Sequence, residues 1–178
     1  TEWIFHSLMM AWVDYLFTGN KDSLEKYYID LKAKSLLVLN REDGLISTMT
    51  GKVNDQVLQS IYLFDKNNPM ITSTLKDIVD WPPGSFATDG TGERDNYEMK
   101  EINTVVNAFH CYGLVLLGKI AKVLNQTEDA KLFEKQSEKV KSTINNKLFD
   151  KKLGLYKDGE GTDHISLHGN MIPLAFDL

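Results

Sequence analysis

Two segments of this chain are apolar on nearly every helical face, and each is followed by an amphipathic segment. The two segments are residues 3–17 and residues 105–124, VVNAFHCYGLVLLGKIAKVL. If each forms a helix, no face of it is mainly polar, which predicts a helix surrounded by other helices. In residues 24–37 and 133–148, apolar side chains instead recur every three or four positions among Lys, Glu and Asp. The sequence therefore predicts two hairpins, each with a buried inner helix and a wet outer helix.

The two predicted hairpins also end alike. The first closes in DGLIS (43–47) and the second in LGLYKD (153–158), with Gly44 and Gly154 at matching places. A third apolar segment, SLHGNMIPLAFDL (166–178), would begin a third hairpin. Inner helices enclosed by outer ones form either an αα-solenoid or a closed αα-toroid, so the expected class is all-α and both architectures stay open.

Composition narrows the range of partners. The 178 residues include 42% hydrophobic and 25% charged residues, which suits one globular domain. The net charge is -5 and Lys and Arg are dispersed, so we expect neither nucleic acid nor an anionic membrane as a partner. We see neither a signal peptide nor an apolar run of the roughly 18 to 20 residues that a membrane span needs. A lone cysteine, Cys111, lies in an apolar run and is expected to pack there.

The segment DWPPGSFATDGTGERDNYEM (80–99) differs from the helical sequence on both sides. Two prolines and three glycines predict a loop with a defined backbone path just before an inner helix. In a toroid, the loops that lead into the inner helices surround the central cavity, where a ligand would bind. Trp81 offers a flat face for a sugar, and Glu93, Arg94 and Asp95 can hydrogen-bond to hydroxyl groups. The alternative is structural: Trp-Pro-Pro as a packed corner, and Glu-Arg-Asp as a surface ion-pair group.

The histidines do not predict a metal site. His164 and His168 stand four residues apart, but no glutamate follows the first as in the zinc-protease motif. We expect His164 to cap a helix or form a buried hydrogen bond, and His168 to contact a sugar or lie in the core. His6 and His110, inside apolar helices, are expected to be core histidines. No cofactor and no metal ion are expected.

Several motifs together resemble one enzyme family. They are TEWIFHSLMMAWVDYLFTGNKDSLEKYY, DIVDWPP, ERDNYE, NTVVNAFHCYGLVLLGKIAKVL and GLYKDGEGTDHISLHGNMIPLAF, in this order along nearly the whole chain. They resemble the catalytic domain of bacterial α-L-rhamnosidases of the six-hairpin glycosidase group. The resemblance implies an (α/α)6 toroid and inverting hydrolysis of terminal α-L-rhamnosyl bonds. An acid and a base would do this chemistry with their carboxyl groups roughly 6.5 to 9.5 Å apart.

The resemblance also implies an incomplete site. In that family the acid lies in a motif upstream of the first hairpin seen here and the base in a motif beyond PLAF, and this chain contains neither motif. Its apolar beginning and end likewise suggest cuts through a larger fold. We therefore expect residues 1–178 to be a single unit, a fragment covering about half of the toroid, which is inactive alone and has the remainder of its own catalytic domain as partner.

The sugar contacts that the family implies fall on few positions. Its aromatic sugar-site positions match Trp3 and Trp81, although the family often has Trp-Gly-Asp where this chain has Trp3-Ile4-Phe5. With these we place Arg94, Asp95 and His168 as substrate-binding residues. Glu93 and Asp95 are candidates for acid and base by residue type alone.

Two alternative functions remain open at this stage. One is another (α/α)6 glycosidase that acts on a different sugar, and the other is a noncatalytic αα-solenoid binding module. The compartment is also open between bacterial cytoplasm, periplasm and exterior. Residues 48–75 match nothing that we recognise.

Overall fold

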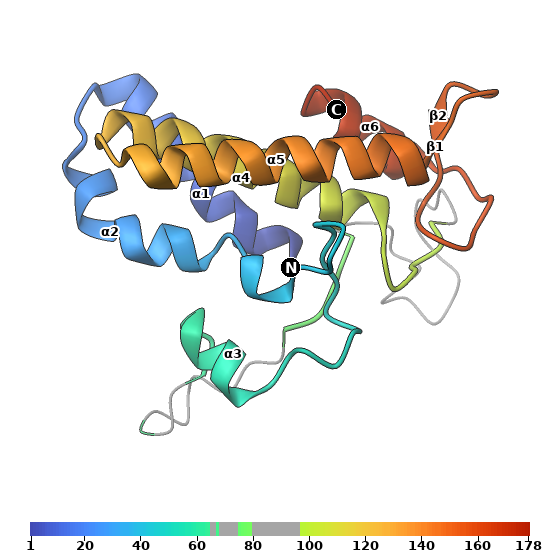
Figure 1. Ribbon diagram of the computed structural model, residues 1–178, viewed down its shortest axis with the longest axis horizontal. Coiled ribbons are helices and arrows are strands. Elements are labelled where there is room, and N and C mark those ends of the chain that lie inside the picture. The colour runs from blue at the N-terminus through green and yellow to red at the C-terminus, as the bar shows by residue number, and fades with distance from the viewer. Residues whose placement is uncertain (65–66, 68–74, 80–96) are drawn as a thin grey trace, which may run out of the picture.

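Nearly all of the regular secondary structure in the described residues is α-helical, as expected (Figure 1). A computed structural model describes residues 1–64, 67, 75–79 and 97–178. Within these residues the elements, in chain order, are α1 (Glu2–Thr18), α2 (Asp22–Ala33), the 3-10 helix η1 (Leu37–Leu39), α3 (Asp55–Ser60), α4 (Thr104–Val123), α5 (Thr127–Lys147), β1 (Phe149–Asp150), β2 (Leu155–Tyr156) and α6 (Leu167–Ala175).

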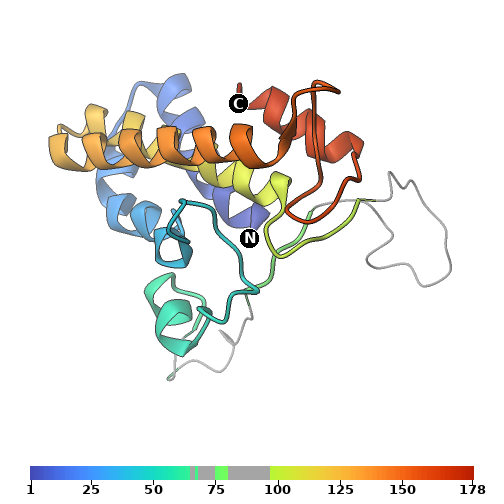
Figure 2. The same cartoon turned by 45° about the vertical axis from the view of Figure 1, so that its right-hand side comes forward.

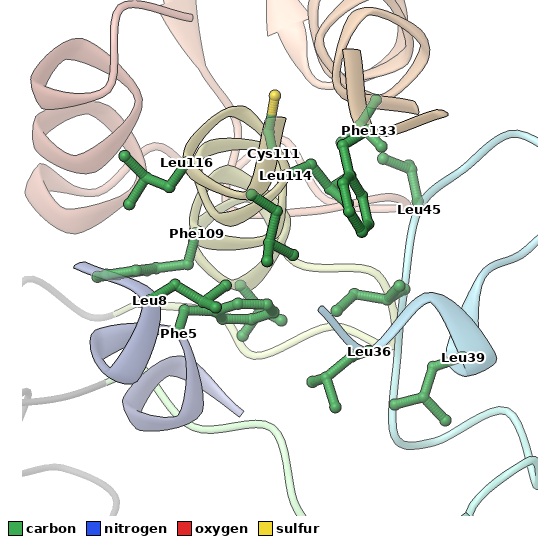
Figure 3. Close-up of a cluster of buried hydrophobic side chains, with 14 of the residues drawn as sticks. Phe5, Leu8, Leu36, Leu39, Leu45, Phe109, Cys111, Leu114, Leu116 and Phe133 are labelled. Atoms are coloured by element: carbon green, nitrogen blue, oxygen red, sulfur yellow. The ribbon is translucent and has the colours of Figure 1, made fainter. Parts of the chain in front are cut away.

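Helix α4 is the centre of the core. Of its 20 residues, 15 are buried, and α1, α2, α5 and α6 all contact it. Phe5 and Leu8 of α1 and Phe133 of α5 converge on α4 beside Leu114 (Figure 3). The prediction that residues 105–124 form an inner helix is confirmed, and most of its surface is buried, although Lys119 and Lys122 are exposed.

The same helix corrects the expectation that the chain contains no apolar segment long enough to span a membrane. Thr104–Val123 is long and apolar enough to cross a membrane by composition, and it is the one such helix in the part of the chain that the structure describes. However, 83% of that window is buried inside the fold. Its apolar character is therefore accounted for by packing against neighbouring helices.

Helices α1, α4 and α6 form an inner layer and run in the same direction. The Phe5 ring of α1 lies 5.9 Å from the His110 ring of α4. Leu8, one turn after Phe5, lies against Gly113, one turn after His110, so the two helices are parallel. The carboxyl end of α6 contacts the same stretch of α4, because Phe176 stacks on Tyr112 with ring centroids 4.4 Å apart. The amino ends of all three inner helices therefore lie at one end of the layer (Figure 2).

Helices α2 and α5 are the outer helices of the two hairpins. Gly118 of α4 faces Phe133 of α5, whereas Cys111, nearer the start of α4, bonds to the Ser137 carbonyl farther along α5, so the two helices are antiparallel. Asp129 at the start of α5 accepts hydrogen bonds from Tyr28 and Lys32, which joins the two outer helices. The predicted alternation of inner and outer helices is confirmed.

The prediction for α1 is wrong in one respect. Its residues form the expected helix, but only Glu2, Phe5 and Leu8 are buried. The opposite face carries Met10, Val13 and Phe17, and the Phe17 side chain is 88% exposed. The physical reason is that α1 packs mainly on α2 and α4, which leaves its outer face exposed in the part of the chain that the structure describes.

One asparagine fixes the loop that closes each hairpin. Asn107 of α4 accepts a hydrogen bond from the Ile46 N–H (2.8 Å) and donates to the Ile46 carbonyl (3.1 Å). Asn170 of α6 holds the N–H and carbonyl of Tyr156 in the same way, at 2.8 and 3.0 Å. Each asparagine is the fourth residue after its helix cap, Asn103 or Ser166.

These two contacts give the sequence repeat a physical meaning. Ile46 pairs with Asn40 and Tyr156 with Phe149 across antiparallel bridges. The glycine two residues earlier is left-handed in both turns, with φ of 91° at Gly44 and 70° at Gly154. The repeat detected in the sequence is therefore a repeated docking of a tight turn on the next inner helix.

The segment that the sequence left unassigned contains one short helix. Asn54 caps α3 by accepting a hydrogen bond from the Val57 N–H at 3.0 Å. The Lys34 ammonium group donates to the Ile61 carbonyl at the end of α3. Burial lowers the pKa of this lysine. These contacts attach α3 to the end of α2.

An ion cluster joins both closing loops to α5. The Arg41 guanidinium forms paired hydrogen bonds with Asp43 (2.9 and 2.6 Å) and with Glu160 (2.8 and 2.6 Å). Lys147, at the end of α5, lies 2.7 Å from Asp43. Arg41 holds the pKa of both carboxyl groups below their usual range.

Replacing Asn107 by Ala should destabilise the chain by about 2 to 3 kcal/mol. The Ile46 N–H and carbonyl would remain buried without a partner, and such groups cost about 1 to 3 kcal/mol each. Urea unfolding measures the loss. Asn146→Ala, on the exposed face of α5, is the matched control and should change the free energy by less than about 0.5 kcal/mol. Equal losses in the two variants would contradict the docking role.

The ion cluster predicts a specific dependence of stability on pH. Because folding lowers the pKa of Asp43 and Glu160, their contribution is complete above the unfolded pKa of about 4 and declines as the pH falls below it. Glu160→Gln should therefore cost roughly 1 kcal/mol at pH 7 and much less near pH 2. Thermal melts across this range provide the measurement. Glu128→Gln, in an exposed pair with Lys131, should show almost no difference at either pH.

Candidate functional site

The amino ends of α1, α4 and α6 form the candidate site. Thr1, Asn103 and Ser166 immediately precede these helices, and the parallel packing places them at one end of the inner layer. Both Asn103 and Ser166 cap their helix, accepting a hydrogen bond from the backbone N–H three residues later at 2.8 and 3.0 Å. Loops that lead into this end can therefore present side chains to a common ligand.

Asp77 organises the part of the site near α1. Its carboxylate accepts hydrogen bonds from the Thr1 hydroxyl (2.7 Å) and the Thr48 N–H (2.8 Å). Its own N–H donates to the Thr48 hydroxyl at 2.8 Å. The chain entering residues 80–96 is thereby attached to the amino end of α1. Beside this contact lies an open hollow of about 540 Å³, with Met49, Val53 and Leu58 among its lining residues.

Asp158 organises the part near α4 and α6. It is fully buried, and its backbone carbonyl accepts hydrogen bonds from the Thr104 N–H (2.8 Å) and the Tyr97 hydroxyl (2.9 Å). Its carboxylate accepts from the N–H groups of Glu98 (2.8 Å) and Ser166 (3.0 Å). One buried residue thus joins the chain leaving residues 80–96 to the first turns of two inner helices.

Two further residues complete the surroundings of Asp158. The His164 Nδ1 atom lies 2.6 Å from its carboxylate, so of the two expected roles His164 has the hydrogen bond, although the ring is only partly buried. Gly169, in the first turn of α6, leaves room for this group. A Cβ atom at that position would lie 2.9 Å from the Asp158 Oδ1 atom.

The sequence-predicted site residues divide into two groups. Trp3 lies in the first turn of α1 with 61% of its surface exposed, and His168 lies half-buried in the first turn of α6. The structure therefore brings these two to the same end of the inner layer. The other four, Trp81, Glu93, Arg94 and Asp95, lie outside the described residues.

The remaining histidines lie in the inner layer. His110 is fully buried, and its Nδ1 atom lies 3.0 Å from the Ser35 carbonyl. Burial lowers its pKa to about 4, so the ring is neutral at pH 7. This confirms the prediction of a core histidine. His6 is half-buried and meets the Phe109 ring edge-on at 5.5 Å.

The sequence analysis missed the residues that organise this end, namely Asp77 and Asp158. Asp77 belongs to DIVDWPP and Asp158 to GLYKDGEG, which we used only to detect the family resemblance. An acidic residue beside a proline or glycine turn is a weak signal by itself, because such residues are usually exposed. Both carboxylates already accept several hydrogen bonds, so each serves to hold its surroundings.

The described residues offer no metal centre. Nowhere in ranges 1–64, 75–79 and 97–178 do three His, Cys, Asp or Glu side chains gather closely enough to hold an ion. Burial raises the pKa of the Cys111 thiol to about 12, which makes it a poor nucleophile. The groups described at this end are hydrogen-bonding side chains, the Glu98–Lys100 ion pair and the exposed Trp3 ring.

Comparison with known families decides the identity of the fold. The sequence model described as the bacterial alpha-L-rhamnosidase 6 hairpin glycosidase domain matches residues 1–178. The chain belongs to this family. The resemblance detected in the motifs is confirmed, and the helical hairpins fit a six-hairpin glycosidase domain. No curated protein matches the chain.

Gly169→Ala should disturb the site of this rhamnosidase-family domain. The added methyl group would press on Asp158 and Ser166, and such crowding costs about 1 to 3 kcal/mol. We expect shifted amide resonances for Glu98, His164 and Ser166, measured by NMR. Gly118→Ala is the control for crowding, because a Cβ atom at this helical position would meet its nearest neighbour at 3.6 Å, an ordinary van der Waals contact. Unchanged resonances around Asp158 in Gly169→Ala would contradict the close packing.

Proposed function

We propose that this chain forms part of an inverting glycoside hydrolase that removes terminal α-L-rhamnosyl groups. The observation that carries the proposal is the family match over residues 1–178. The parallel inner helices support it, because their amino ends gather loops and polar side chains around one region. The ligand is accordingly a carbohydrate, a rhamnosylated glycan or glycoside.

In this proposal the sugar binds at the amino ends of the inner helices. Trp3 and Trp81 provide flat apolar faces for the sugar ring, and Arg94, Asp95 and His168 hydrogen-bond to its hydroxyl groups. The positions of Trp3 and His168 at this end support the assignment.

The catalytic pair is proposed to come mainly from the remainder of the catalytic domain. Inversion requires an acid on the leaving oxygen and a base that activates water from the opposite face. Asp77 and Asp158 are unsuited to these roles, because their oxygens accept hydrogen bonds that hold the fold. Glu93 and Asp95 remain the candidates within this chain.

Exposed apolar surface supports the proposal that these 178 residues make about half of the toroid. Met10, Val13 and Phe17 line one face of α1, and Met171 and Leu174 lie on the exposed side of α6, where Leu174 is 83% exposed. An apolar surface of this kind on an inner helix is expected to contact another helix. We propose that further hairpins of the same catalytic domain cover both faces.

The decisive experiment measures hydrolysis of an aryl α-L-rhamnoside. The complete catalytic domain should release the aryl group, and proton NMR should show β-L-rhamnose as the first sugar product. The 178-residue chain alone should be inactive. Turnover by this chain would instead assign Glu93 and Asp95 as the acid and base, and an α-anomer would overturn inversion. Inactivity of the complete domain on rhamnosides would overturn the proposed substrate.

Sugar binding can be tested separately from catalysis. L-rhamnose should change the tryptophan fluorescence of the complete domain, D-glucose should not, and Trp81→Ala should lose most of the response. Trp12→Phe is the matched control, because Trp12 lies farther along α1 beside Lys119 and away from the amino end. A response lost in Trp12→Phe and kept in both Trp3→Ala and Trp81→Ala would contradict the proposed site.

A further inference from the structure

We propose that His164 is a sugar-hydroxyl contact of this site, and that buried Asp158 holds its ring in the required tautomer. The inference rests on the proposed function, because it assigns a further residue to the same carbohydrate site. It concerns a residue for which sequence analysis predicted only a cap or a buried hydrogen bond.

The first step concerns the proton on the ring. A carboxylate can only accept hydrogen bonds, so the 2.6 Å contact with Asp158 Oδ2 requires a proton on the His164 Nδ1 atom. The backbone N–H groups of Glu98 and Ser166 also donate to this carboxylate, which keeps it surrounded by donors. In the neutral form of the ring the lone pair then lies on Nε2, which is a hydrogen-bond acceptor.

The second step concerns access. The Asp158 side chain is fully buried, whereas 30% of the His164 side chain is exposed. Nδ1 is occupied by Asp158, and no group in the described parts of the chain forms a hydrogen bond with Nε2. The partly exposed ring therefore has an acceptor available for a hydroxyl group.

The third step concerns the neighbours of His164. It lies two residues before the cap of α6 and four before His168, at the amino end where the proposed sugar binds. Glu98 lies beside the same carboxylate, because its N–H donates to Asp158 at 2.8 Å, and its side chain accepts a hydrogen bond from the Thr162 hydroxyl at 2.6 Å. Imidazole and carboxylate acceptors side by side suit a ligand with adjacent hydroxyl donors, which is the chemistry of a sugar.

A purely structural role is the competing explanation, and two variants separate the two. In His164→Asn the side-chain amide can still donate to Asp158, but nothing replaces Nε2. His164→Ala removes both groups. If the contact with Asp158 only holds the loop, the Asn variant should behave like the natural protein in every assay.

The experiment combines nitrogen NMR of the histidine rings with a titration of the complete catalytic domain by L-rhamnose. The ring shifts should show the proton of His164 on Nδ1, and the Nε2 resonance should move on adding rhamnose. His164→Asn should keep a thermal midpoint within about 2 °C of the natural protein yet bind rhamnose about threefold to tenfold more weakly, the effect of one neutral hydrogen bond. His164→Ala should also melt at a lower temperature.

The outcomes distinguish this inference from the proposed function. A proton on Nε2 would overturn the inference whatever the sugar does. Rhamnose binding with an unmoved His164 resonance and full affinity in His164→Asn would overturn it while the proposed function stands. If rhamnose changes neither the tryptophan fluorescence nor any ring resonance, both fail together.

Discussion

The burial of most of α4 is the constraint on which the rest of the structure depends. A helix enclosed on all sides can carry polar side chains only where each one finds a partner. Asn107 binds the Ile46 backbone, Thr104 donates its hydroxyl to the Lys157 carbonyl, and His110 meets the Ser35 carbonyl. The buried polar residues of α4 therefore attach three loops to one helix. A loop that is tied to a rigid core helix has a defined position at the surface.

This arrangement explains how a helical layer can support a binding site. The backbone carbonyl of Asp158 accepts a hydrogen bond from the Thr104 N–H, and its carboxylate accepts one from the Ser166 N–H. These two bonds fix the starts of α4 and α6 relative to each other. Asp77 holds the start of α1, because its carboxylate accepts a hydrogen bond from the Thr1 hydroxyl. Side chains that contact a ligand need supporting groups of this kind, because small displacements weaken hydrogen bonds and stacking. The buried acids supply support for the exposed side chains near them, which we propose contact a sugar.

Helix periodicity predicted the architecture because it reports directly on burial. The apolar residues of 105–124 and the one-sided pattern of 133–148 identified an inner and an outer helix, and both are confirmed. Periodicity could not assign Asp158 or His164. Their roles come from contacts across long sequence separations, such as Asp158 with Glu98, which are 60 residues apart. Trp3 was selected from the family resemblance, and its place in the first turn of α1 depends on helix packing that no local pattern specifies.

The difference between α1 and α4 shows how far an apolar sequence predicts the burial of a helix. Both sequences are apolar on nearly every face, yet in the described residues α4 packs on α1, α2, α5 and α6, whereas α1 packs mainly on α2 and α4. Sequence therefore specifies the burial that a helix requires, and the surroundings decide how much of it is met. Met10, Val13 and Phe17 remain exposed on α1 because the described residues supply no partner for that face. Helix α1 is a regular helix whose outer apolar face is exposed in the described residues. This exposed face is the reason for proposing that further hairpins of the same domain pack against it.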